Sequence, residues 1–123
     1  NLLMSDNIPS LKSLMDIGSE AIGDDLASIM WNGPQATLNL TVNAQPAIIM
    51  HAALVHGALK AMGVDLMASA SMTAGHSVGE YASAYISGAI DLDVVMGIAQ
   101  FRGEVMQKCV GDEGARMVAL MGR

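Results

Sequence analysis

The chain has 123 residues, enough for one domain or part of one, and 52% of them are hydrophobic, which excludes a disordered tail. The formal net charge is −6, and the six Lys and Arg residues are scattered, so we expect no nucleic-acid partner. The single cysteine, Cys109, can form neither an internal disulfide nor a metal site, and it favours a reducing compartment. The longest apolar stretch, residues 44–59, includes Gln45, His51 and His56, so we expect a buried helix there and no membrane span.

The first half of the chain has the periodicity and capping signals of helices. A helix is predicted over residues 10–22 and a short one over 25–30, before the break at 32–34 (Asn-Gly-Pro). Residues 38–43 are expected to form a loop. The next helix is expected to begin at Pro46 and to end near Met62, because proline is tolerated at the first position of a helix.

The second half combines helix signals with two candidate strands. Residues 68–74 (ASASMTA) are small and apolar and end at Gly75, and helices are predicted over 78–86 and 92–110. A last strand is expected over 116–121. Strands that alternate with helices indicate an α/β fold with a parallel sheet. Two parallel strands do not make a stable core, so further strands are expected outside this sequence.

A G-x-S-x-G motif lies between the first candidate strand and the helix that follows it. In a nucleophile elbow the serine, here Ser77, sits on a strained turn between a strand and a helix. We expect Gly75 and Gly79 to be required because a side chain at either position would collide with nearby backbone. The N–H of Val78, at the start of the helix, can then stabilise an oxyanion. Five residues alone occur by chance in a chain with 13 glycines, but this context makes the motif more specific.

Residues 75–81 (GHSVGEY) resemble the GHS-x-GEY signature of the acyltransferase family, which includes malonyl-CoA:acyl-carrier-protein transacylases and the acyltransferase domains of fatty-acid and polyketide synthases. Residues 45–47 (QPA), 88–89 (GA) and 102–103 (RG) are similar to further family motifs in the same order. The resemblance covers residues from about 35 to 123 and is far more specific than the elbow alone.

The resemblance implies a two-step acyl transfer in fatty-acid biosynthesis. Ser77 would take a malonyl group from CoA as an ester and pass it to the phosphopantetheine thiol of acyl carrier protein. Val78 would supply an oxyanion N–H, Arg102 would bind the malonyl carboxylate, and Met106 would lie near the acyl group. The implied partners are acyl carrier protein and the CoA thioester. Malonyl-CoA would be a substrate, and no bound cofactor or metal is implied.

Arg102 also has support from the helical pattern alone. It falls along the apolar stripe of the helix over 92–110, where a buried guanidinium needs an anionic partner. The partner can be a substrate carboxylate, or it can be Glu80 or Asp91 in an ordinary salt bridge. The stripe consists of Leu92, Val95, Met96, Ala99 and Met106.

Two parts of the family's site are missing from this sequence. The glycine- and glutamine-rich segment (GQG-x-Q-like) of the family's first strand has no counterpart, and the family's general-base histidine lies beyond 123 residues. His76, His51 and His56 are not convincing replacements, because His76 adjoins the sharp turn and the other two are five residues apart on one helix. The resemblance therefore implies that residues 1–123 are part of the large subdomain of an α/β-hydrolase-like domain of roughly 300 residues. Its first strand and a downstream small subdomain would be missing, and the isolated piece would be inactive.

Two other functions remain open at this stage. An esterase or lipase of the α/β-hydrolase type would use the same elbow with water as the acceptor, although a neutral acyl ester needs no buried cation. A non-catalytic part of a synthase would not need an intact Ser77. We expect a cytoplasmic or organellar protein (mitochondrial or plastid) rather than a secreted one, since the first residues do not form a charged segment followed by an apolar one.

Overall fold

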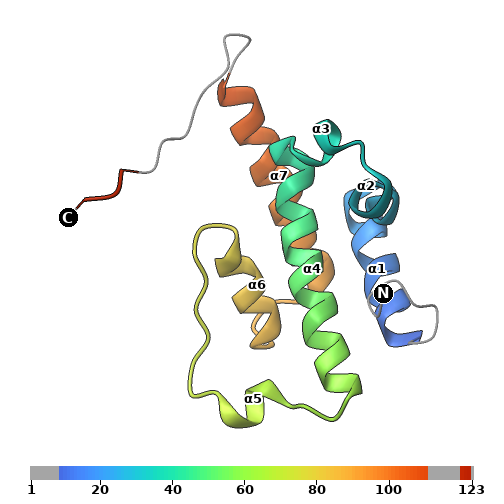
Figure 1. Cartoon of the computed structure of the whole chain (residues 1–123), viewed down its shortest axis with the longest axis vertical. Helices are drawn as coiled ribbons and strands as arrows, with labels where there is room; N and C mark the ends of the chain where they lie inside the picture. Colours follow the sequence, from blue (N-terminus) through green and yellow to red (C-terminus); the bar gives the residue numbers. More distant parts are fainter. Residues whose placement is uncertain (1–8, 111–119, 123) are drawn as a thin grey trace.

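The computed structural model describes residues 9–110 and 120–122, and these residues form seven helices and no strand (Figure 1). Long helices dominate, and the shorter ones occupy the connections. In chain order they are α1 (Pro9–Ile22), α2 (Leu26–Asn32), α3 (Gln35–Leu38), α4 (Thr41–Ala61), α5 (Leu66–Ser69), α6 (Gly79–Ile86) and α7 (Leu92–Val110).

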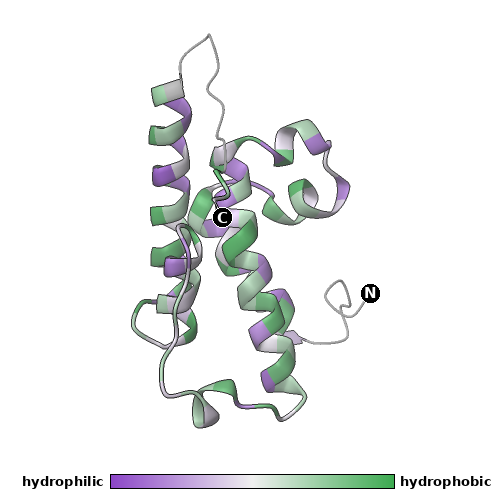
Figure 2. Cartoon of the chain, turned by 60° about the vertical axis from the view of Figure 1, so that its left-hand side comes forward, coloured by the Kyte–Doolittle hydropathy of each residue, from purple (hydrophilic) through white to green (hydrophobic). Residues whose placement is uncertain are grey.

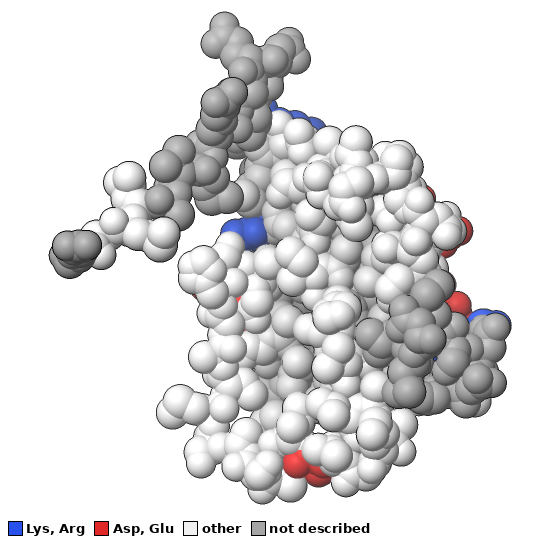
Figure 3. Space-filling view, viewed as in Figure 1, with Lys and Arg blue, Asp and Glu red and all other residues white. Residues whose placement is uncertain are grey.

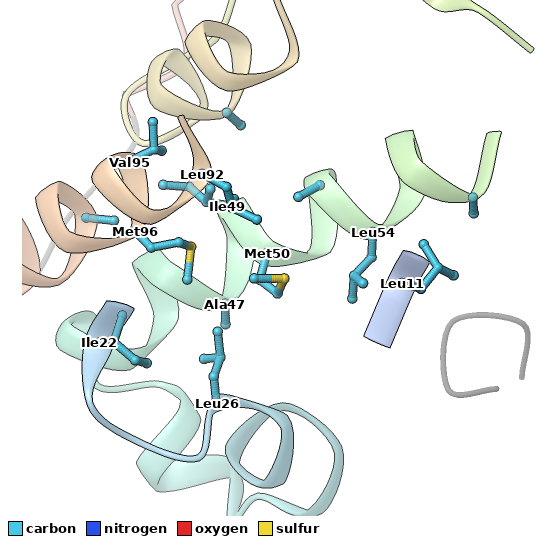
Figure 4. Packing of buried hydrophobic residues seen from close by; sticks show 14 residues of the cluster. Leu11, Ile22, Leu26, Ala47, Ile49, Met50, Leu54, Leu92, Val95 and Met96 are labelled. Carbon is cyan, nitrogen blue, oxygen red and sulfur yellow. The ribbon is translucent and has the colours of Figure 1, made fainter. Parts of the chain in front are cut away.

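Helix α4 is the centre of the packing. It contacts α1, α6 and α7, and in Figure 1 it lies between α1 and α6 with α7 behind it. Figure 4 shows Ile49, Met50 and Leu54 of α4 meeting residues of α1 and α7. Burial of these apolar side chains is the main stabilising contribution of this core. Its fully buried members include Leu26, Ile49, Met50, Leu54, Val95 and Met96.

The apolar stripe of α7 is confirmed over most of its length. Leu92, Val95, Met96 and Ala99 are all buried against the neighbouring helices. Met106 is not, since 38% of its surface is exposed. The stripe therefore loses its cover toward the C-terminal end of α7, beside Arg102.

Helix α4 begins five residues earlier than predicted. Thr41 is its first residue, and Pro46 lies inside the helix instead of at its start. Local bonds hold the first turn: the N–H groups of Asn43 and Ala44 donate to the Leu40 carbonyl, and Asn43 Nδ2 donates to the Thr37 carbonyl. A long-range bond joins it to α7, where Gln107 Oε1 accepts from the Thr41 N–H. Tertiary contacts thus extend the helix through residues whose local sequence indicated a loop.

The strand predicted over residues 68–74 is not present in the structure. Asp65 caps the short helix α5 by accepting from the N–H groups of Met67 and Ala68, and the chain then runs without regular structure to the elbow. The backbone of Ala70 is extended, with φ −88° and ψ 131°, but a strand also needs a neighbouring strand to pair with. No such neighbour exists among the residues that the structure describes, so the parallel sheet is not observed there.

The second predicted strand falls largely on residues whose structure is not described. Residues 116–119 lie outside the described ranges. Leu120 and Met121 belong to no strand and are 94% and 95% exposed.

Surface properties agree with the composition. Figure 2 shows hydrophobic and hydrophilic residues mixed along the helices, and none of the described helices is long and apolar enough to cross a membrane. Figure 3 shows few, scattered Lys and Arg side chains on the face it presents, without a continuous basic patch over the described residues.

Candidate functional site

Ser77 occupies a strained turn directly before α6. Its φ of +54° lies in the left-handed region, and no other non-glycine residue in the described part of the chain has a positive φ. For a residue with a Cβ this conformation costs about 1–2 kcal/mol, so the surrounding structure must hold it. The turn is closed by the Gly79 N–H, which donates to the His76 carbonyl at 2.9 Å, and the Glu80 N–H, which donates to the Ser77 carbonyl at 3.1 Å. The predicted elbow geometry of the serine is therefore present without its strand.

The two glycines of the elbow differ in what they allow. A Cβ at Gly75 would lie within 3.0 Å of the Gly79 carbonyl and of the Glu80 amide nitrogen, and backbone atoms cannot swing aside. A Cβ at Gly79 would meet nothing within 4 Å among the described residues. The collision predicted at Gly75 is confirmed, and the one predicted at Gly79 is wrong.

Val78 follows the serine as the N-cap of α6. N–H groups in the first turn of a helix have no acceptor within the helix itself, and they lie at its positive end. This placement suits the oxyanion role that the sequence predicts for the Val78 N–H.

Arg102 reaches the elbow from α7. Its Nη2 donates to Ser77 Oγ at 3.0 Å, and its Nη1 donates to Oε1 of Gln45 on α4. The Arg102 guanidinium thus joins Ser77, 25 positions before it in the sequence, and Gln45, 57 positions before it. The alternative salt bridge to Glu80 or Asp91 is not seen in the described part of the chain, where the ion pair found joins Lys108 and Glu104 on the surface at 3.9 Å.

Gln45 is the site residue whose role the sequence did not reveal. It is only 5% exposed, and its Nε2 donates to Thr41 Oγ1 at 2.9 Å and to Met106 Sδ at 3.4 Å. Met106, predicted to lie near the acyl group, is therefore in direct contact with the group that binds Arg102. The available signal was the one glutamine of a mostly apolar helix, because a buried amide requires partners.

Gly103 explains how α7 comes so close to the start of α4. A Cβ at this position would lie 2.6 Å from Val42 Cα and 2.7 Å from the Thr41 carbonyl oxygen. The Thr41 N–H also donates to Gln107 Oε1 at 3.3 Å. Arg102 is therefore held where two helix backbones nearly touch.

The histidines do not complete a catalytic pair in the described residues. His76 is exposed beside the elbow, His51 is exposed on α4, and none of the three histidines is hydrogen-bonded to Ser77. His56 lies farther along α4, with a buried Nδ1 that has no partner among the described atoms. Within the same residues, no cluster of three His, Cys, Asp or Glu side chains could hold a metal ion.

Comparison with known proteins finds related sequences and structures. Residues 15–122 match the family described as acyl transferase domain. The malonyl CoA-acyl carrier protein transacylase of Bacillus subtilis is 32% identical over 95% of this chain, and that of Escherichia coli K12 is 30% identical over 97%. The chain spans only 36% and 38% of the length of these two relatives.

Solved structures give the same similarity. The acyl-carrier-protein S-malonyltransferase of Burkholderia pseudomallei aligns with a TM-score of 0.73 and 33% identity, over 80% of this chain and 31% of that one. A malonyl-transacylase solved with its type II polyketide acyl-carrier protein aligns with a TM-score of 0.74 and 29% identity, over 83% and 32%. The helical arrangement described above therefore recurs within larger proteins.

Proposed function

Because this chain belongs to the acyl transferase domain family, we propose that its protein transfers a malonyl group from CoA to the phosphopantetheine thiol of an acyl carrier protein. The observation that carries the proposal is the 3.0 Å hydrogen bond from Arg102 Nη2 to Ser77 Oγ. It puts a permanent cation beside the nucleophile, where it can pair with an acyl group that ends in a carboxylate.

The reaction proceeds in two displacements. In the first, Ser77 Oγ attacks the thioester carbonyl and the hydroxyl proton passes to a base. The base then protonates the sulfur of CoA, which leaves as a thiol, and the malonyl group remains on Ser77 as an ester. The phosphopantetheine thiol then attacks the ester and releases Ser77. The Val78 N–H stabilises the oxyanion in both steps, and the resemblance assigns the base to a histidine outside the described residues.

Selection of the acyl group rests on Arg102 and its surroundings. The guanidinium pairs with the malonyl carboxylate, and Met106 lies beside the acyl chain at the uncovered end of α7. Gly75 has no side chain, which permits the tight turn of the elbow, and Gly79 is the first residue of α6. Malonyl-CoA is bound as a substrate, and the chemistry requires no resident cofactor.

We further propose that the chain is part of the large subdomain of an α/β domain of roughly 300 residues. Support comes from the relatives, of which it spans little more than a third. Residues 70–74 then pair with strands from elsewhere in that domain; the extended backbone at Ala70 and the 82% exposure of Met72 support this.

A reducing compartment, cytoplasmic or organellar, suits the exposed thiol of Cys109.

The test is covalent capture of the malonyl group. Full-length protein briefly incubated with malonyl-CoA should gain one malonyl adduct by intact-mass measurement, and the adduct should be absent in Ser77→Ala. Addition of holo acyl carrier protein should then move the malonyl group onto the carrier. If the adduct persists in Ser77→Ala, the nucleophile is not Ser77. Release of free malonate without transfer to the carrier supports the esterase alternative.

A further inference from the structure

We infer that Gln45 is a specificity-determining positioning residue, which holds Arg102 in the orientation that selects a carboxylated acyl group. The inference rests on the proposed malonyl transfer. Gln45 does not touch the reacting atoms. It acts through the guanidinium, by accepting a hydrogen bond from Nη1 while Nη2 is directed at Ser77 Oγ.

The orientation of the Gln45 amide follows from its partners. An amide presents an oxygen that accepts and a nitrogen that only donates, whereas a guanidinium only donates. Arg102 therefore requires the oxygen of Gln45. Thr41 Oγ1 and Met106 Sδ accept from the nitrogen at 2.9 Å and 3.4 Å. In the opposite orientation the Thr41 hydroxyl could still donate to the amide oxygen, but the bonds to Arg102 and to Met106 would both be lost.

The amide is anchored in a rigid part of the molecule. Gln45 is 5% exposed and lies on α4, one turn after Thr41, whose own N–H is held by Gln107 of α7. At Gly103 the backbone of α7 lies directly against Val42 and Thr41 of α4, so the two helices are closely packed at this crossing. The packing of α4 against α7 thus fixes Gln45, and Gln45 in turn fixes the orientation of the Arg102 guanidinium.

Arginine side chains have many rotamers, and fixing one orientation loses conformational entropy. An acceptor on Nη1 restricts that freedom before a substrate arrives, which favours binding of a carboxylate to the remaining donors. An acetyl group has no carboxylate, so its transfer gains nothing from this restriction. Removal of the Gln45 oxygen should therefore weaken malonyl transfer selectively.

The experiment compares malonyl and acetyl transfer to holo acyl carrier protein by full-length wild type, Gln45→Met and Gln45→Asn. Methionine keeps the length and volume of the side chain without an acceptor, and asparagine keeps an amide that is too short. Each variant should lower the malonyl-to-acetyl ratio of kcat/KM by roughly ten- to a hundredfold, because a hydrogen bond to a charged group is lost. The ratio is internal to one preparation, so a partly unfolded sample does not alter it.

Two controls separate positioning from stability. Gln100→Met removes a half-buried glutamine outside the site, whose Nε2 donates to the Ile22 carbonyl at 2.9 Å, and it should leave the ratio unchanged. In an Arg102→Ala background, Gln45→Met should have no further effect on the ratio, since Gln45 acts only through Arg102.

The outcomes distinguish this inference from the function on which it rests. A wild-type protein that transfers no malonyl group refutes the proposed function itself. A wild type that transfers malonyl, with Gln45→Met lowering malonyl and acetyl transfer by the same factor, overturns the positioning role alone. A ratio that still falls on Gln45→Met in the Arg102→Ala background also overturns it.

Discussion

The elbow provides a sharp test because its two glycines should respond in opposite ways to the same substitution. Gly75→Ala and Gly79→Ala each add one methyl group, four residues apart, on either side of Ser77. Only the methyl group at position 75 would clash, because its neighbours are backbone atoms of Gly79 and Glu80.

The magnitude follows from those contacts. Ordinary van der Waals contact begins near 3.4 Å, and the new Cβ would lie well under 3.0 Å from three backbone atoms. The first turn of α6 must therefore shift by roughly 1 Å or more to accommodate it. That turn carries Val78 and supports the left-handed backbone of Ser77. We expect Gly75→Ala to destabilise the protein by about 3 kcal/mol, at the upper end of overpacking effects. Gly79→Ala should be neutral or stabilise it by up to about 1 kcal/mol, because alanine favours a helix.

Both quantities are measurable on the full-length protein. In a domain of roughly 300 residues, 3 kcal/mol corresponds to a fall in Tm of roughly 5–10 °C, which differential scanning calorimetry resolves easily. Intact-mass measurement after brief exposure to malonyl-CoA should show little adduct on Gly75→Ala and a normal amount on Gly79→Ala. If Gly75→Ala melted with the wild type and was acylated as fast, the close approach at the elbow would be refuted.

Three further substitutions test the remaining parts of the site. Ser77→Gly should be more stable than Ser77→Ala by about 1 kcal/mol, because glycine adopts the positive φ without strain; neither should be acylated, and equal melting temperatures would contradict the strain. Arg102→Ala should lower malonyl transfer roughly a hundredfold or more and leave acetyl transfer unchanged, whereas equal losses in kcat/KM would indicate a structural arginine. Gly103→Ala should destabilise by about 1–3 kcal/mol in chemical denaturation through its clash with α4, while Gly97→Ala, with open space around it on the same helix, should be neutral or stabilising.

Features that depend on neighbours in the chain could be predicted from the sequence. The bounds of α7 agree with the prediction over 92–110, and α1 and α6 begin within one residue of theirs. Helix hydrogen bonds join residues four apart, so periodicity and capping residues are sufficient to indicate them. The elbow serine was identified in the same way, because a glycine pair around a serine is a local pattern.

Features that depend on distant residues were decided only by the tertiary structure. Residues 68–74 have the composition of a strand, yet a strand forms only where a second strand offers its N–H and C=O groups, and the described residues offer none. The early start of α4 depends on α7, through Gly103 and Gln107.

The hydrogen-bond partner of Arg102 is the clearest feature that could not be predicted from the sequence. Its charge and position on α7 predicted an anion, either a substrate or a nearby carboxylate. Folding instead brings it to the neutral Gln45, 57 residues away, and to Ser77. Sequence determined that this guanidinium needs oxygen acceptors, because a half-buried cation requires them. Which oxygens those are was determined by the crossing of α4 and α7, since hydrogen bonding depends on distances in space that only packing sets.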